Sequence, residues 1–155
     1  MNAWLKGFLR GLTPQESLTV DEWACKYRVL SSRGSSEPGK YRVDRTPFLR
    51  EPMEELSAGS SVQRVVMMFA VQLGKTETMN NFIGYCIDHS PAPMLMVQPT
   101  LQMAQRLSKQ RLESMLQDTP CLAEKIPPPR SRDSGNSQFA KIFPGGVLIL
   151  TGANS

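Results

Sequence analysis

Residues 72–76, with the sequence Gln-Leu-Gly-Lys-Thr, contain the residue types that grip a nucleoside triphosphate. A glycine lets the backbone approach phosphates closely, and the backbone N–H groups of such a turn bind phosphate oxygens. A lysine at this place can reach the outer phosphates, and a threonine hydroxyl can ligate Mg²⁺. We therefore predict that Lys75 bridges the β- and γ-phosphates of ATP and that Thr76 holds the metal ion.

The neighbours of Lys75 have supporting roles in this prediction. Gln72 and Leu73 would contribute backbone amides, and Gly74 would allow an approach that a side chain would block. Glu77, in the first turn of the expected helix, completes the predicted nucleotide-binding set. The N-terminus of that helix would add a partial positive charge near the phosphates.

The elements on either side of residues 72–76 bear on whether this stretch is a phosphate-binding loop. The complete phosphate-loop pattern has a glycine five positions before Gly74, where this chain has Phe69. The apolar run 64–69 is typical of a strand buried on both faces, and residues 75–88 have the apolar stripe of a helix. These elements favour a phosphate site, while an ordinary turn between a strand and a helix is the alternative.

The same alternation of elements continues to the end of the chain. We expect a second buried strand at 94–97, a helix carrying apolar residues from 103 to 116, and a loop at 127–136. Residues 141–150 should form a hairpin or a turn into a third core strand. Strands and helices alternating over short connections predict parallel pairing.

The predicted fold class is therefore α/β. More specifically, we expect a partial P-loop NTPase domain of the RecA or helicase type, with parallel core strands and a helical N-terminal segment. Residues 1–60 would be that segment, with a possible adenine-contacting region, and residues 61–155 would be the incomplete ATPase core. In the first segment, residues 19–22 fit a capping box, Thr46 should cap a helix with Pro47 in its first turn, and Trp23 and Tyr27 should face inward.

Composition excludes several kinds of protein. The chain has 155 residues, 40% hydrophobic and 21% charged, with a net charge of +4, which is typical of one globular domain with a modest basic excess. No apolar run is long enough to span a membrane, so a cytoplasmic location is expected. Three widely spaced cysteines without a C-x-x-C pair argue against a zinc site and for reduced thiols, and the single histidine, His89, is expected to cap a helix or lie on the surface.

Residues 98–100, Gln-Pro-Thr at the end of the second expected strand, resemble the conserved block that borders the nucleic-acid track in helicase-like ATPases. Four polar residues of the following helix could contact nucleic-acid phosphates: Gln105, Arg106, Lys109 and Arg111. The alternative is that Thr100 only caps the helix and that these side chains form its solvated face.

Acidic residues are missing where ATP hydrolysis would need one. The reaction requires a carboxylate at the tip of a further core strand, to anchor Mg²⁺ and orient the attacking water. The apolar runs of this chain end at 69–70, 98–99 and 151–152 without an acid, and no Asp or Glu follows Asp133. The sequence therefore predicts ATP binding without hydrolysis by this chain alone.

Several blocks, in one order, resemble the large terminase subunit of tailed bacteriophages, specifically the lambda-type (GpA-like) family. They lie at 19–23, 39–49, 72–76, 81–85, 93–100, 108–111, 143–146 and 151–155. The resemblance implies a motor ATPase that packages viral DNA, joined to a C-terminal metal-dependent nuclease that cuts concatemeric DNA. It also implies double-stranded DNA, a small terminase subunit and the portal of the procapsid as partners, and an oligomer for the full-length protein only. Phe48 falls near the adenine-contacting aromatic of the family, although it could equally belong to the core.

Two departures from the family pattern matter. Many terminases have an arginine three positions before the loop glycine, where this chain has Val71. The acidic strand and the nuclease would lie beyond Ser155, so we expect the chain to be the N-terminal piece of such a subunit, located in the cytoplasm of the bacterial host. The alternatives are a non-catalytic remnant that only docks a partner such as the small subunit and, less favoured, a small phosphotransferase.

Overall fold

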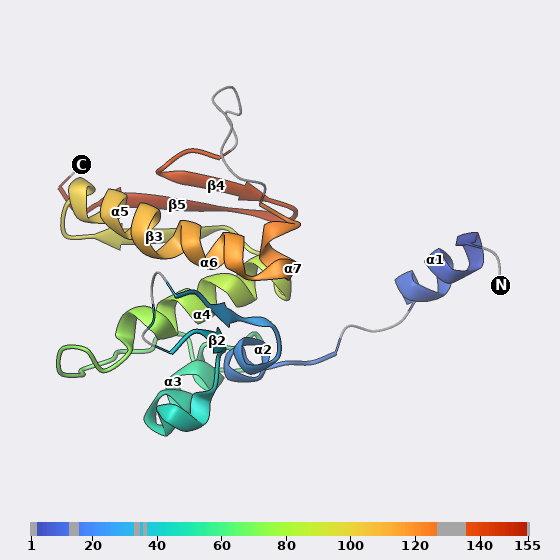
Figure 1. Cartoon of the computed structure of the whole chain (residues 1–155), viewed down its shortest axis with the longest axis horizontal. Coiled ribbons are helices and arrows are strands. Elements are labelled where there is room, and N and C mark those ends of the chain that lie inside the picture. The colour runs from blue at the N-terminus through green and yellow to red at the C-terminus, as the bar shows by residue number, and fades with distance from the viewer. Residues whose placement is uncertain (1–2, 13–15, 33–34, 36, 127–135, 155) are drawn as a thin grey trace.

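The computed structural model describes residues 3–12, 16–32, 35, 37–126 and 136–154, and it shows an α/β arrangement (Figure 1). The helices are α1 (Ala3–Leu12), α2 (Val20–Tyr27), α3 (Arg50–Glu55), α4 (Lys75–Asp88), α5 (Leu101–Leu107), α6 (Glu113–Asp118) and α7 (Pro120–Ala123), with 3-10 turns at Val43–Arg45 and Pro47–Leu49 and a π-helical turn at Ser108–Leu112. The strands are β1 (Val29–Leu30), β2 (Gly39–Lys40), β3 (Met94–Gln98), β4 (Ala140–Phe143) and β5 (Gly146–Gly152). The loop expected at 127–136 lies, apart from its last residue, outside the described residues.

A three-stranded mixed sheet forms the C-terminal half, in the order β3-β5-β4. β3 pairs in parallel with β5, from Met94 opposite Leu148 to Gln98 opposite Gly152. β4 and β5 are antiparallel and form a hairpin whose turn contains Gly145, with φ of 88°. Parallel pairing is confirmed for β3 and β5, and of the two arrangements expected for residues 141–150 the hairpin is observed.

Within the described part of the chain, helices cover one face of this sheet. α5, the π-helical turn and α6 run together across that face (Figure 1), over the buried side chains of Met96, Leu148 and Leu150. On the other face Leu95, Val97, Ile142 and Ile149 are exposed. The strand predicted at 94–97 forms, but it is not buried throughout as expected, since Leu95 and Val97 face outward.

The covered face also contains a lysine. Lys141 of β4 is buried with its ammonium 3.7 Å from Glu113 of α6. Burial lowers the pKa of Lys141, and the carboxylate of Glu113 opposes that shift. This ion pair joins α6 to the β4 edge of the sheet.

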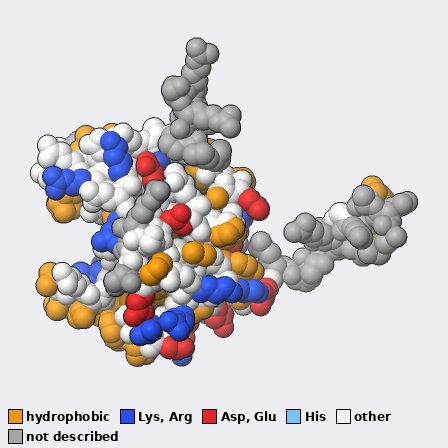
Figure 2. Space-filling view, viewed as in Figure 1, with side chains coloured by type: hydrophobic (Ala, Val, Ile, Leu, Met, Phe, Trp, Pro, Cys, Tyr) orange, Lys and Arg blue, Asp and Glu red, His pale blue; other side chains and the backbone are white. Residues whose placement is uncertain are grey.

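The strand predicted at residues 64–69 does not form. The segment is extended without a strand partner among the described residues, and alternate side chains are half-buried and exposed. Val66 and Met68 are 74% and 92% exposed, and exposed apolar side chains gather at the left edge of Figure 2. The composition favours a strand, but extended backbone becomes a stable strand only when a neighbour accepts its hydrogen bonds.

The N-terminal half confirms some local predictions and corrects others. Thr19 and Glu22 form the expected capping box of α2. Trp23 is fully buried and donates to Asp88 of α4 at 2.8 Å, whereas Tyr27 is exposed and the prediction for it was wrong. Pro47 does occupy the first turn of a 3-10 helix, but the side chain of Thr46 makes no capping hydrogen bond.

Helix α4 confirms the prediction for residues 75–88 and packs against α2, α3 and α7. His89 is its C-terminal cap residue, as expected, and the His89 side chain also accepts a hydrogen bond from the Leu18 amide at 3.4 Å. The three cysteines are free thiols. Burial raises the pKa of Cys86 to about 11 and that of Cys121 to about 12, so both stay protonated at neutral pH. No helix in the described part of the chain is both long enough and apolar enough to cross a bilayer.

Gly84, in the middle of α4, makes the close packing of Trp23 possible. A Cβ atom built on Gly84 would lie 2.3 Å from the Trp23 ring. We expect Gly84→Ala to lower the free energy of unfolding by about 1–3 kcal/mol, because this overlap outweighs the better helix propensity of alanine. Urea unfolding measures the change, and Gly59→Ala, whose Cβ would meet nothing within 4 Å, is the matched control. Equal stability of the two variants would contradict the packing described here.

Candidate functional site

The loop before α4 has an unusual backbone. Gln72 has φ of 62° and Gly74 has φ of 83°, so two residues in the left-handed region lie two positions apart. For Gln72 this conformation is strained, and such strain is concentrated at ligand-binding sites. Left-handed residues alternating with others turn successive N–H groups toward a common point, which creates an anion-binding concavity.

The buried side chain of Leu49 restricts the path of this loop. A Cβ atom on Gly74 would lie 2.5 Å from Cδ1 of Leu49, which is itself buried at the end of the 3-10 helix Pro47–Leu49. Only glycine therefore satisfies both the left-handed backbone and the contact with Leu49. The loop is thus held by the N-terminal half of the chain.

Helix α4 begins with amide groups that no side chain caps. Gly74 is the N-cap residue and has no side chain to accept a hydrogen bond, and the first helical bond runs from the Thr78 amide to the Gly74 carbonyl at 2.9 Å. The N–H groups of the first turn need acceptors from elsewhere, and the helix dipole favours an anionic one. This is the arrangement that binds phosphate at helix N-termini.

Lys75 reaches back over the loop. Its Nζ donates to the carbonyl oxygens of Phe69 and Ala70 at 2.8 and 2.7 Å. The ammonium group is therefore held against the backbone that precedes the loop. Because lysine has three donors on a flexible stem, it can exchange these carbonyls for phosphate oxygens without a change in the backbone.

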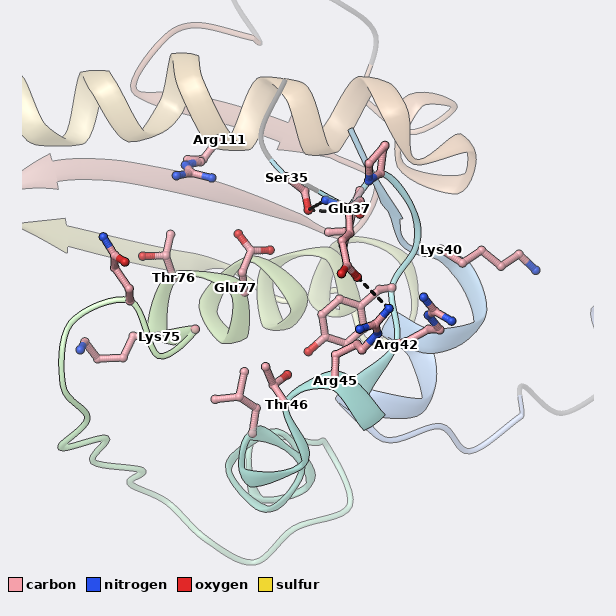
Figure 3. A pocket seen from close by; sticks show the side chains of 16 residues that line it. Ser35, Glu37, Lys40, Arg42, Arg45, Thr46, Lys75, Thr76, Glu77 and Arg111 are labelled. Atoms are coloured by element: carbon pink, nitrogen blue, oxygen red, sulfur yellow. Dashed lines mark hydrogen bonds and ion pairs between the residues drawn. The ribbon is translucent and has the colours of Figure 1, made fainter. Parts of the chain in front are cut away.

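A cavity of about 1080 Å³ opens beside this loop (Figure 3). This volume is slightly above the usual range for small-molecule sites. Sixteen residues line it: Leu30, Ser35, Glu37, Pro38, Lys40, Tyr41, Arg42, Arg45, Thr46, Leu49, Gln72, Gly74, Lys75, Thr76, Glu77 and Arg111. The wall therefore combines the loop and first turn of α4 with residues 30–49 and one residue of the π-helical turn.

The cavity wall is basic. Its lining contains five lysine or arginine residues and two glutamates. Glu37 forms an ion pair with Arg45 at 3.1 Å, and Glu77 forms one with the buried Arg28 behind the wall. Since both carboxylates have cationic partners, the remaining charge of the cavity favours an anionic ligand.

Arg28 and Tyr41 connect this wall to α4. The Arg28 guanidinium donates to Asn81 and to the Glu77 carbonyl, and it lies 5.6 Å from the ring centre of Tyr41. Burial raises the pKa of Tyr41, so its phenol keeps its proton at neutral pH. These contacts fix the orientation of Glu77 and support the floor of the cavity.

The structure brings together five of the seven predicted nucleotide-binding residues. Gln72, Gly74, Lys75, Thr76 and Glu77 all line the cavity. Two others, Leu73 and Phe48, do not line it. Phe48 is 48% exposed, and its ring meets that of Phe69 edge-on at 6.1 Å.

Sequence reasoning missed most of the opposite wall. Tyr41, Arg42 and Arg45 belong to the block 39–49, which contributed to the family resemblance but received no role at the site. Their part in the cavity depends on the packing of β1 against α6 and of β2 against α2, which no local pattern predicts. The cluster of three cationic residues within 40–45 was the available signal.

The residues considered for nucleic-acid contact separate into distinct places. Thr100 caps α5 by accepting a hydrogen bond from the Met103 amide at 3.2 Å, as its simpler interpretation predicted. Gln105 bonds Gln138 at 2.6 Å, and Arg106 and Lys109 are exposed. Arg111 lies at the cavity.

These observations define an α/β protein in which a glycine-bearing loop, a lysine and a helix N-terminus meet at a basic cavity. The chain belongs to the family described as phage terminase large subunit gpA, ATPase domain, whose model matches residues 35–155. The matched residues include every residue of the cavity lining except Leu30. No curated protein and no solved structure matches the chain.

The contact between Gly74 and Leu49 can be tested with a double-mutant cycle. Gly74→Ala should lower the free energy of unfolding by about 1–2 kcal/mol from backbone strain alone, and more because of the overlap with Leu49. In the Leu49→Ala background the cost should shrink by at least about 0.5 kcal/mol, since the overlapping side chain is gone. Urea unfolding of the four proteins measures the coupling. Gly59→Ala combined with Leu49→Ala should be additive, and additivity for Gly74 too would refute the contact.

Proposed function

We propose that this chain binds ATP with Mg²⁺ in the cavity, with the triphosphate at residues 72–77, as the nucleotide-binding part of a DNA-packaging ATPase. The observation that carries the proposal is the meeting of Lys75, the uncapped N-terminus of α4 and a basic wall around one cavity. Membership of the terminase ATPase family supports it independently. The family match covers residues 35–155, which include the loop and nearly all of the cavity lining.

Each residue of the loop has a role in this proposal. The amides of residues 72–74 and of the first turn of α4 bind the inner phosphates, and Lys75 neutralises the outer ones. The exposed hydroxyl of Thr76 is a hard oxygen ligand of the kind that Mg²⁺ accepts beside phosphate oxygens, and the ion would offset the charge of the phosphates. Gly74 keeps the loop narrow enough for its amides to touch the ligand.

In this proposal each of the two parts of the chain binds a different part of the nucleotide. Residues 61–155 supply the phosphate side, and residues 1–60 supply the side of the base through Tyr41, Arg45 and Thr46. Contact between Phe48 and adenine remains a prediction from the family resemblance. Double-stranded DNA, a small terminase subunit and a portal are the partners proposed for the complete subunit, in the cytoplasm of a bacterial host.

The cavity wall provides few groups that could catalyse ATP hydrolysis. Glu77, which lines the cavity two residues after Lys75, is held in an ion pair by Arg28. A carboxylate in an ion pair is a poor base for activating water. We therefore propose that the chain by itself binds ATP and releases phosphate slowly or not at all.

Nucleotide binding can be tested by titrating a fluorescent ATP analogue with Mg²⁺. We expect Lys75→Ala to weaken binding by about 10- to 100-fold, because a charge-assisted hydrogen bond to phosphate contributes about 1.5–3 kcal/mol. The matched control is Lys109→Ala, which removes an exposed lysine outside the cavity lining and should bind as the parent protein does. Binding that is unaffected by Lys75→Ala, or absent from the parent protein, would refute the proposed site.

A second function, partner docking without catalysis, is favoured by helix α1. Its side chains Trp4, Leu5, Phe8 and Leu12 are exposed, and Trp4 stacks on Phe8 with ring centres 5.9 Å apart. Figure 1 shows this helix standing away from the rest of the chain. An exposed apolar helix face is a common docking element for partner proteins.

Docking through α1 predicts a different sensitivity to mutation. Trp4→Ala combined with Phe8→Ala should abolish co-purification with a small terminase subunit, because it removes the two aromatic side chains that would anchor the helix. Lys75→Ala should leave co-purification intact and serves as the control. Retention of the complex by the double variant would exclude α1 as the docking element.

A further inference from the structure

One wall of the cavity comes from a part of the chain remote from the loop. Among the lining residues, Arg111 alone belongs to the helical layer formed by α5, the π-helical turn and α6. In Figure 3 it lies above Thr76 and Glu77, on the side of the cavity opposite Arg45 and Thr46. The cavity thus receives a cation from the layer that covers the sheet.

The π-helical turn sets the direction of this side chain. The Glu113 amide bonds to the Ser108 carbonyl, five residues back, so the turn is one residue wider than in an α-helix. Four residues at a constant spacing of four are all buried: Ala104, Ser108, Leu112 and Leu116. In an α-helix of 3.6 residues per turn, such residues would gradually rotate away from the sheet, and the wide turn corrects this rotation. Such turns are frequent at functional sites, and this one places Arg111 at the cavity while its neighbours Ser108 and Leu112 remain buried.

The base of Arg111 is also held firmly. Ser108 and Leu112 are fully buried on either side of it. At the start of α5 the Leu101 amide nitrogen would lie 2.4 Å from a Cβ atom on Gly152, so the helix rests directly on the backbone of β5. A guanidinium on a rigid element is well suited to bind an anion, since its flat fork matches two phosphate oxygens at once.

The position of Arg111 within the cavity indicates which group it would meet. Figure 3 places it at the same end as Lys75 and Thr76, whereas Glu37, Lys40 and Arg42 lie at the other end. The loop amides would enclose the phosphates that lie against the backbone, while Arg111 approaches from the opposite wall. We propose that Arg111 binds the terminal phosphate of the nucleotide and so makes this site discriminate ATP from ADP. This inference rests on the proposed function, because it assumes that the triphosphate lies at the loop.

The test compares the affinities for fluorescent ATP and ADP analogues, both with Mg²⁺, in the full chain. Arg111→Ala should weaken ATP binding by about 10-fold or more and leave ADP binding within about twofold. Arg111→Lys keeps the charge without the fork and should show an intermediate loss for ATP only. The matched control is Arg106→Ala, an exposed arginine on the same helical layer outside the cavity lining, which should change neither affinity. Thermal melts establish that the three variants remain folded.

The possible outcomes distinguish a failure of the role of Arg111 from a failure of the proposed nucleotide site. A loss for ATP alone in Arg111→Ala supports it. No loss, or equal losses for ATP and ADP, overturns it, and if Lys75→Ala still weakens both nucleotides the proposed nucleotide site survives. If the parent protein binds neither nucleotide, both the proposed function and this inference are wrong.

Discussion

The contact between Gly74 and the buried Leu49 side chain is the constraint on which the site depends. It joins the loop to the N-terminal half of the chain, so the amides before α4 point in a direction that distant residues impose. Without that support, a loop that includes Gln72 in the left-handed region would relax to a less strained backbone. The anion-binding character of the loop is therefore a property of packing as much as of its glycine.

Charged residues lie both behind the cavity wall and on it. Arg28, buried behind the wall, holds Glu77 and keeps its carboxylate from dominating the cavity, and Tyr41 packs against the same guanidinium. In front of them, cations from β2, the 3-10 turn Val43–Arg45, α4 and the π-helical turn line one cavity. Burying a charge is unfavourable unless it is paired, so the buried Arg28 is itself evidence that Glu77 belongs at this position.

Apart from helix α1, apolar surface is exposed in two main places among the described residues. One is the outer face of the sheet, and the other is the extended segment 64–70, whose outward side chains include Met68. Parallel sheets normally have both faces covered, and extended apolar segments normally pair with a neighbour. The α/β class was predicted correctly because alternating strands and helices follow from local periodicity. The buried strand predicted at 64–69 does not form, because strand pairing depends on a neighbouring strand and not on composition.

The sequence by itself determined the local features. The capping box of α2, the bounds of α4, the hairpin of β4 and β5 and the set of residues around Lys75 all follow from patterns within a few positions, where propensity and hydrogen bonding act directly. The tertiary structure alone decided which residues face Lys75 across the cavity, that Phe48 turns to Phe69 and that Arg111 joins the site. Those outcomes depend on contacts between segments tens of residues apart, whose geometry is set by core packing rather than by any spacing along the chain.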